Sequence, residues 1–205
     1  MVFLLGLTGN IACGKSTVGQ LLADCFGAEY IDADRLVHAL YAAGTPQTTA
    51  IAARFGQDLL KEDGTIDRRR LGDIVMSNQS ALKDLEGILD PGVSQAILDR
   101  LEHTSAPVLV LDAIRLIETG RASRCDAVWV VICDPDAQLQ RLQASRGLSA
   151  EQAQLRIAAQ GPVEEKLRHA SAVITNHGSL EDLAAQVEKA WAKTVQPKLA
   201  ERTED

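Results

Sequence analysis

One glycine-rich segment constrains the fold of this chain more than any other feature, because of what stands on either side of it. The segment fits the pattern G-x-x-x-x-G-K-[ST]. An apolar run at residues 2–8 predicts a buried strand before it, and apolar residues spaced three and four apart predict a helix over residues 17–26 after it. This order of strand, loop and helix predicts a phosphate-binding loop made of Gly9, Asn10, Ile11, Ala12, Cys13, Gly14, Lys15 and Ser16.

The residue types of the loop explain how it would hold phosphate. Its glycines let the backbone curl so that successive N–H groups point at phosphate oxygens, and the helix start adds the positive end of its dipole. Lys15 supplies a mobile charge for the β- and γ-phosphates, and Ser16 offers a hydroxyl to Mg²⁺. The alternative interpretation is a glycine turn that only caps a helix.

Composition and charge restrict the partners of the chain. Of its 205 residues, 46% are hydrophobic and 24% are charged, which is typical of a globular protein in water. We expect no membrane segment and no secretory signal, because the apolar runs are short and no basic segment precedes the first of them. A formal net charge of −7 offers no broad basic surface to nucleic acid. The four cysteines lack C-x-x-C spacing, so we expect reduced thiols and a cytoplasmic protein.

Short apolar runs alternate with helical patterns, which predicts an α/β fold with a parallel sheet flanked by helices. The runs that we expect to form strands lie at residues 2–8, 28–31, 108–111, 127–132 and 172–175. Two helical stretches interrupt this alternation and predict a helical insertion and a helical lid.

These interruptions divide the chain into four expected parts. The parts are a nucleotide-binding core at residues 1–43, 106–135 and 171–196, a helical acceptor-binding region at 44–105, a lid at 136–170, and a frayed polar tail at 197–205. Within the helical region, turn-forming pairs are expected to separate the helices. These pairs are Thr45–Pro46, Asp63–Gly64 and Asp90–Pro91.

Two other classes of nucleotide-binding protein do not fit the sequence. A GTPase would need an N-K-x-D motif to recognise its base, and the chain has none. A dinucleotide-binding fold would need a G-x-G turn, which is also missing. Transport-type and AAA-type ATPases usually need more chain or a signature that does not occur here. A compact phosphoryl-transfer kinase remains.

Three aspartates stand where strands of the predicted sheet end, next to the loop. Asp32 and Asp34 follow the second strand, and we expect Asp34 to orient or deprotonate an attacking hydroxyl, leaving Asp32 to cap or support the next helix. Asp112 follows the third strand, where a carboxylate can contact Mg²⁺ through water. The alternatives are that one of the pair merely caps the helix at residues 35–41 and that Asp112 is an ordinary strand-end residue.

Two arginines fall in the expected lid. Arg141 lies on the helix after the fourth strand, and Arg146 precedes a glycine. Such side chains could close over a transferring phosphoryl group and neutralise the charge that develops on it. The alternative is that both arginines lie on a solvated helix face.

At this point the chain resembles the dephospho-coenzyme A kinase family from Leu5 to about Trp191. The resemblance rests on an ordered set of segments rather than on the loop alone. These are LTG…GKST at residues 7–17, IDAD at 31–34, FG at 55–56, DGTIDR at 63–68, LEGI at 85–88, DAVWVV at 126–131, QLQRL at 138–142, RGLS at 146–149, RIAAQ at 156–160 and VITN at 173–176.

The resemblance implies transfer of phosphate from ATP to the ribose 3′-hydroxyl of dephospho-coenzyme A, the last step of coenzyme A synthesis. We expect the protein to be a monomer or small homo-oligomer. The resemblance also implies a role for each matching residue. Lys15 and Ser16 would handle the ATP phosphates and Mg²⁺ with Thr17 completing the nucleotide-binding loop, Asp34 would be the base, Arg141 the lid arginine, and Asn176 would lie near the adenine.

The chain departs from the family pattern at three places. Ile114–Arg115–Leu116–Ile117–Glu118 stands where Pro-Leu-Leu-Phe-Glu is usual, Asp90–Pro91 replaces His-Pro, and Ala170–Ser171 replaces Ala-Asp. Arg115 could reach a substrate phosphate or only line the cleft. Two other functions therefore stay open: a kinase of another small acceptor such as a nucleoside, nucleotide or sugar, and a nucleotide-binding regulator without transfer activity.

Overall fold

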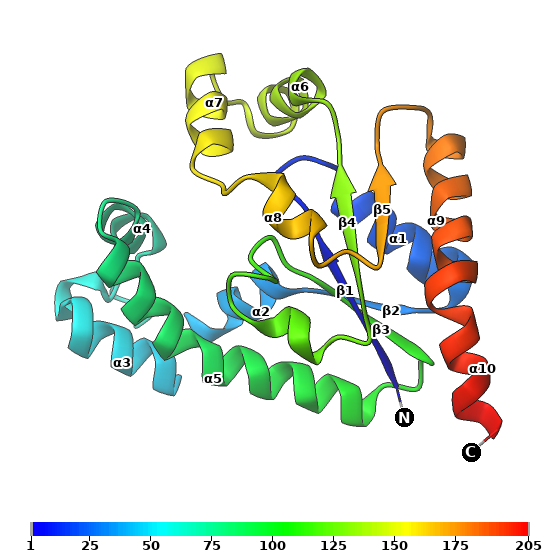
Figure 1. Ribbon diagram of the computed structural model, residues 1–205. Coiled ribbons are helices and arrows are strands. Elements are labelled where there is room, and N and C mark those ends of the chain that lie inside the picture. The colour runs from blue at the N-terminus through cyan, green and yellow to red at the C-terminus, as the bar shows by residue number, and fades with distance from the viewer. Residues whose placement is uncertain (1, 205) are drawn as a thin grey trace. The chain divides into compact units, whose positions relative to one another are not determined.

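The computed structural model describes residues 2–204, which form two compact units: residues 2–31 with 104–204, and Asp32–His103. Figure 1 labels the α-helices and strands of both units, which also contain two short 3-10 helices, η1 and η2. In chain order they are β1 (Phe3–Thr8), α1 (Lys15–Phe26), β2 (Glu29–Asp32), α2 (Ala33–Leu40), α3 (Pro46–Phe55), η1 (Gln57–Leu59), α4 (Arg68–Met76), α5 (Gln79–His103), β3 (Val108–Asp112), η2 (Arg121–Arg124), β4 (Ala127–Ile132), α6 (Pro135–Arg146), α7 (Ala150–Ala158), α8 (Val163–Leu167), β5 (Ala172–Thr175), α9 (Leu180–Thr194) and α10 (Gln196–Glu204).

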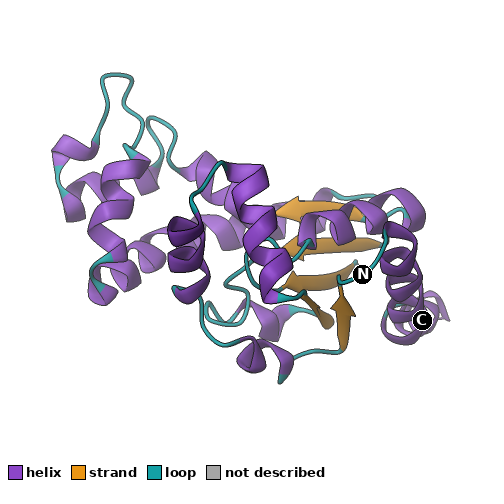
Figure 2. Ribbon diagram, turned by 90° about the horizontal axis from the view of Figure 1, so that it is seen from above, coloured by secondary structure: helices purple, strands orange, loops and turns teal. Residues whose placement is uncertain are grey.

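The strands form one five-stranded sheet in the order β2-β3-β1-β4-β5. The central strand β1 runs parallel to β3 and β4, with Leu5 opposite Val110 on one side and Ala127 on the other, and β4 runs parallel to β5. Figure 2 shows the strands side by side between helices. The expected α/β fold is confirmed, and each strand lies within one residue of its predicted bounds at either end.

One face of the sheet is covered by α1 and α9. Phe3, Leu5 and Leu7 alternate along β1 and contribute to this core, which also takes Leu22 from α1 and Trp191 from α9. Burial of each large apolar side chain is worth about 1.5–3 kcal/mol, so this layer holds α1 firmly against the sheet. The start of α1, and with it the end of the glycine-rich loop, is thereby fixed at the carboxyl end of β1.

The opposite face of β1 is covered closely by the segment that follows β3. A Cβ added to Gly6 would lie 2.6 Å from Cδ2 of Leu116 and 2.9 Å from Sγ of Cys125. Gly6 therefore lets the chain after β3 lie directly on the sheet, beneath the loop that β1 leads into.

The helical unit has its own core, and α5 packs against α2, α3 and α4. The prediction that Asp90–Pro91 separates two helices is wrong, because α5 runs through Pro91 without interruption. Leu85, Leu89 and Val93 recur every four residues across the proline and are all buried. Their burial offsets the cost of the lost N–H donor, about 3 kcal/mol. No helix within residues 2–204 combines the length and hydropathy that a membrane span needs.

The two units divide the chain differently from the sequence analysis. The helical unit begins at Asp32 rather than at residue 44, so it includes α2. Helices α6, α7 and α8, which correspond to the expected lid, group with the sheet. The reason for the second difference is a small apolar cluster in which Leu142 of α6 and Ala153 of α7 pack against Ile11 of the loop.

The C-terminal segment forms helix α10 from Gln196 to Glu204, so the expectation of a frayed tail is wrong for these residues; residue 205 lies outside the described part. Leu199 packs against the main core. Arg202 pairs with the Asp126 carboxylate at 2.5 Å, and Lys198 donates to the Asp126 carbonyl at 2.6 Å. These contacts explain the order of a segment that is polar in sequence.

Candidate active site

The glycine-rich loop connects β1 to α1 and needs its glycines for two different reasons. Gly9 has a φ of 142°, and a Cβ at this position would lie 2.1 Å from the carbonyl oxygen of Val131 in β4. Gly14 caps the N-terminus of α1 with a left-handed φ of 97°, and a Cβ there would lie 2.1 Å from Nδ2 of Asn176. Ala12 alone among the described non-glycine residues has a positive φ, at 58°. Such strain costs of order 1–3 kcal/mol and is typical of functional loops.

Replacing Gly9 by alanine should lower the free energy of unfolding by about 2–4 kcal/mol, since the new Cβ overlaps the β4 backbone and the φ angle is one that alanine avoids. Chemical denaturation measures the change. Gly72→Ala is the control, because an added Cβ inside α4 meets nothing within 4 Å and should raise stability by about 0.5–1 kcal/mol. A Gly9→Ala protein as stable as the wild type would contradict this close approach.

Side chains from α6 and from the residue that follows β5 donate hydrogen bonds to three backbone carbonyls of the loop. Gln138 of α6 donates to the Ile11 carbonyl at 2.7 Å, and Arg141 of α6 donates to the Ala12 carbonyl at 3.5 Å. Asn176, which follows β5, donates through Nδ2 to the Cys13 carbonyl at 3.0 Å. Because carbonyls and N–H groups of a curled loop point in opposite directions, anchoring the carbonyls outward favours N–H groups that face inward.

Two loop N–H groups have protein partners of their own. The N–H of Ile11 donates to Oε1 of Gln160 at 2.8 Å, and the N–H of Cys13 donates to the Asn10 carbonyl at 3.4 Å. These two N–H groups are therefore engaged within the protein, and the donation of loop N–H groups to phosphate stays a prediction. The sequence contains no local signal for the Gln160 contact, which joins residues 149 positions apart.

Lys15 begins α1, and its side chain extends back toward residue 10 of the loop. It is buried, and Nζ donates to the Asn10 carbonyl at 3.4 Å. Oδ1 of the same Asn10 is buried and has no hydrogen-bond partner among the described residues. Ser16 and Thr17 follow in the first turn of α1 and are exposed. The start of α1 therefore combines the charge of Lys15, the positive end of the helix dipole and the exposed hydroxyl of Ser16. This combination suits the phosphate groups of a nucleotide.

Asp112 is the last residue of β3 and is buried. Tyr30 of β2 donates its hydroxyl to Oδ2 of Asp112 at 2.7 Å, and this orients the carboxylate. The tyrosine ring occupies the space that a side chain at Gly19 would need, since a Cβ there would lie 2.1 Å from the ring. Sequence reasoning missed Tyr30, because a tyrosine in a strand gives no sign of its tertiary partner.

The chemistry of these residues fits Mg²⁺. The described residues contain no group of three or more His, Cys, Asp or Glu side chains that could hold a metal ion. Mg²⁺ does not require such a group, because it takes one or two carboxylates together with phosphate oxygens and waters. The Ser16 hydroxyl and the Asp112 carboxylate are hard oxygen ligands of this kind.

The two expected lid arginines lie in different surroundings. Arg141 is half-buried and donates to the Asn176 carbonyl at 3.2 Å in addition to its contact with the loop, so it does not lie on a solvated helix face. Arg146 is the last residue of α6 and is exposed. Asn176 is buried; its side-chain amide donates to the Cys13 carbonyl of the loop, and its backbone carbonyl accepts from Arg141.

Asp32 and Asp34 belong to the helical unit, at the start of α2. Oδ1 of Asp32 accepts the N–H of Asp34 at 2.8 Å, so the prediction that Asp32 caps this helix is confirmed. The helix begins at Ala33, two residues earlier than predicted. Asp34 is exposed in its first turn. Within this unit, Asp90 lies in the middle of α5.

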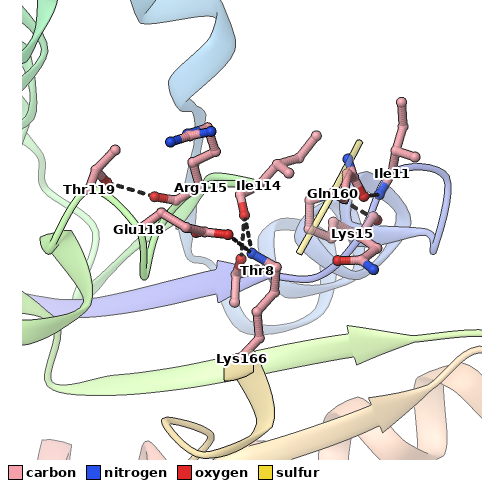
Figure 3. A network of polar contacts seen from close by, with 10 residues as sticks. Thr8, Ile11, Lys15, Ile114, Arg115, Glu118, Thr119, Gln160 and Lys166 are labelled. Atoms are coloured by element: carbon pink, nitrogen blue, oxygen red, sulfur yellow. Dashed lines mark hydrogen bonds and ion pairs between the residues drawn. The ribbon is translucent and has the colours of Figure 1, made fainter. Parts of the chain in front are cut away.

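A polar network supports the segment after β3 that carries Arg115 (Figure 3). Lys166 of α8 is only 2% exposed, and its ammonium group donates to the Ile114 carbonyl at 2.7 Å and to the Glu118 carboxylate at 2.6 Å. Thr8 donates to the same Ile114 carbonyl at 3.2 Å. The Arg115 side chain is exposed and points away from Lys166 in Figure 3. Sequence reasoning missed Lys166, which sits in a charged stretch typical of a helix surface.

Replacing Lys166 by methionine should lower the free energy of unfolding by about 1–3 kcal/mol, because the Ile114 carbonyl and the Glu118 carboxylate lose a shared donor. The expected loss of unfolding free energy stays moderate because the partly exposed Glu118 carboxylate can hydrogen-bond to water in the variant. Urea denaturation measures the loss. Lys193→Met, on an exposed position of α9, should stay within about 0.5 kcal/mol of the wild type. Equal stability of the two variants would show that the network contributes nothing.

Comparison with known proteins gives a consistent result. A family model described as "Dephospho-CoA kinase" matches residues 3–182. The dephospho-CoA kinase of Geobacter sulfurreducens is 43% identical over 193 residues, which cover 93% of this chain and 98% of the relative.

Two solved structures have the same fold over nearly their whole length. A Thermus thermophilus crystal structure has a TM-score of 0.83 at 32% identity, covering 95% of this chain and 98% of the other. The dephospho-CoA kinase of Campylobacter jejuni has a TM-score of 0.67 at 29% identity, covering 97% of this chain and all of the other. With a phosphate-binding loop at the end of the central parallel strand and these relatives along almost the full chain, the protein belongs to the dephospho-CoA kinase family of P-loop kinases.

Proposed function

We propose that this kinase transfers the γ-phosphoryl group of ATP to the ribose 3′-hydroxyl of dephospho-coenzyme A, with the nucleotide held by residues 9–17. The observation that carries the proposal is the loop itself: its carbonyls are anchored outward by Gln138, Arg141 and Asn176, while Lys15 lies over it. This arrangement presents positive charge at the carboxyl edge of the sheet, in a chain that matches its relatives end to end.

In the proposed reaction the 3′-oxygen attacks the γ-phosphorus, the bond from that phosphorus to the bridging oxygen breaks, and ADP leaves. Asp34 accepts the proton of the hydroxyl and later passes it to water. Lys15 and Arg141 neutralise the charge that builds up on the phosphoryl oxygens and on the leaving ADP. Ser16 and Asp112 would hold Mg²⁺, which would supply additional positive charge to the phosphates when it is bound with ATP.

We assign acceptor binding to the helical unit and closure over the phosphates to α6 and α7. We further propose that the enzyme works in the cytoplasm as a monomer or small homo-oligomer, without nucleic acid or membrane as a partner.

ADP release from Mg-ATP tests the acceptor, comparing dephospho-coenzyme A with adenosine, a nucleoside panel and no acceptor. The expected result is turnover only with dephospho-coenzyme A, giving a product phosphorylated at the 3′ position. Turnover on another acceptor would mean that the helical unit serves a different substrate. ATP binding without turnover on any acceptor would indicate a regulator.

A further inference from the structure

Two cysteines meet at the phosphate-binding loop. Cys13 lies inside the loop and is 4% exposed, and Cys133 follows the last residue of β4 and is half-buried. They are 120 residues apart in sequence, yet their Sγ atoms lie 3.1 Å apart, with the thiol of Cys133 donating to Cys13. The proposed kinase reaction uses neither sulfur atom.

The other two cysteines have different surroundings. Cys125 is packed beneath Gly6, and burial raises the pKa of its thiol to about 12, which leaves it protonated and unreactive. Cys25 is exposed near the end of α1. Of the four thiols, Cys13 and Cys133 form the thiol pair that the structure brings into contact.

The two thiols of the pair differ in their readiness to ionise. The hydrogen bond from Cys133 lowers the pKa of Cys13 to about 7, helped by the charges of Lys15 and Arg141 and opposed by burial. The same hydrogen bond, together with burial, raises the pKa of Cys133. Cys13 is therefore the thiol of the pair that ionises more readily, and Cys133 is its hydrogen-bond donor, an arrangement like that of a reactive cysteine beside a second cysteine that can resolve it.

We propose that Cys13 and Cys133 are a reversible oxidation site, at which hydrogen peroxide converts the two thiols into a disulfide that restrains the phosphate-binding loop. The Cys13 thiolate attacks one peroxide oxygen, the O–O bond breaks, and hydroxide leaves, giving a sulfenic acid. The sulfur of Cys133 then attacks the Cys13 sulfur, the S–O bond breaks, and the departing hydroxide takes the Cys133 proton. In sum, two thiols and one peroxide give one disulfide and two waters, and a dithiol reductant reverses the change.

The geometry requires little movement to form the bond. The Sγ atoms must approach from 3.1 Å to about 2.05 Å, a shift that side-chain rotation can supply. The bond would tie the middle of the loop to the end of β4. The loop needs freedom there, because the N–H groups of Ile11 and Cys13 must leave Gln160 and Asn10 before they can donate to phosphate.

The expected effect follows from this loss of freedom. Misplacement of binding groups by about 1 Å can cost on the order of 100-fold in turnover, so we expect oxidation to lower kcat/KM for ATP by about 10- to 100-fold. Affinity for Mg-ATP should fall in the same range. The effect on turnover rests on the proposed function, whereas the disulfide and the affinity for Mg-ATP do not depend on which acceptor is used.

The test treats the full-length protein with hydrogen peroxide, blocks the remaining thiols and digests it without reductant. In the wild type, mass spectrometry should find a peptide containing residue 13 linked to one containing residue 133, and the number of free thiols should fall from four to two. Calorimetric titration with Mg-ATP should show weaker binding after oxidation, and dithiothreitol should restore both binding and turnover.

Two serine variants serve as controls. Cys133→Ser should keep its basal turnover but form no peptide that links residue 13 to residue 133 after peroxide treatment. Cys25→Ser should form the linked peptide and lose Mg-ATP affinity as the wild type does. Four free thiols after peroxide treatment, a linkage through Cys25 instead, or a linked protein with undiminished affinity for Mg-ATP would each overturn the proposal.

Discussion

Replacing Lys15 by alanine should lower kcat by about 100- to 1,000-fold, the usual cost of removing one group that stabilises charge in a transition state. Lys15 begins α1 and lies over the loop, so its ammonium group is placed to follow the charge that passes from the γ-phosphoryl group to ADP. Steady-state ADP release with Mg-ATP and dephospho-coenzyme A measures the effect.

The same experiment needs a measure of folding, because Lys15 is buried. Lys15→Met keeps most of the side-chain volume without the charge, and it should lose as much activity as the alanine variant. Thermal unfolding should change little for the methionine variant. A kcat within twofold of the wild type for either variant would remove Lys15 from the mechanism.

Changing Asp34 to asparagine should lower kcat by about 100- to 10,000-fold, the range typical of losing a general base, with little change in ATP affinity. The side chain keeps its size and can still accept hydrogen bonds, but it can no longer take a proton at neutral pH. Rapid-quench measurement of the phosphorylated product, together with calorimetric titration of ATP, separates the two quantities.

Asp32→Ala is the matched control for this substitution. Asp32 caps α2 by accepting the N–H of Asp34, so its loss should lower the free energy of unfolding by about 0.5–2 kcal/mol. Its kcat should fall much less than that of Asp34→Asn. If kcat and ATP affinity decline together in the Asp34 variant, that residue has a structural role instead.

The features that could be predicted from sequence are those with local signals. Each of the five strands appears within one residue of its expected bounds. The reason is clearest for β1, β3 and β4, which are buried along almost their whole length and leave continuous apolar segments in the sequence. The loop has a motif and a required context, and it sits between β1 and α1 as expected. Capping of α2 by Asp32 also follows from a local pattern.

The features that could not be predicted depend on partners distant in the sequence. Gln138 and Gln160 hold the loop across more than 120 residues, and Lys166 reaches Ile114 across 52. A glutamine or lysine on a helix looks solvated until the partner is known. The same holds for α10, whose polar residues are ordered by Asp126 rather than by any property of their own segment.

Pro91 shows the opposite case, in which a strong local signal is overridden. A proline usually ends a helix, but the apolar residues on either side of it share one buried face of α5. The tertiary core of the helical unit therefore decides the local structure at this position, as it often does when propensity and burial disagree.

The anchoring of the loop also bears on the order in which the chain matures. The loop is synthesised well before the side chains that hold its carbonyls, which belong to Gln138, Arg141 and Asn176. A nascent chain that ends before residue 138 has the motif without any of these three side chains to hold its shape. Since a ligand that binds only the folded state adds its binding energy to that state, ATP would stabilise finished molecules and leave unfinished ones unprotected.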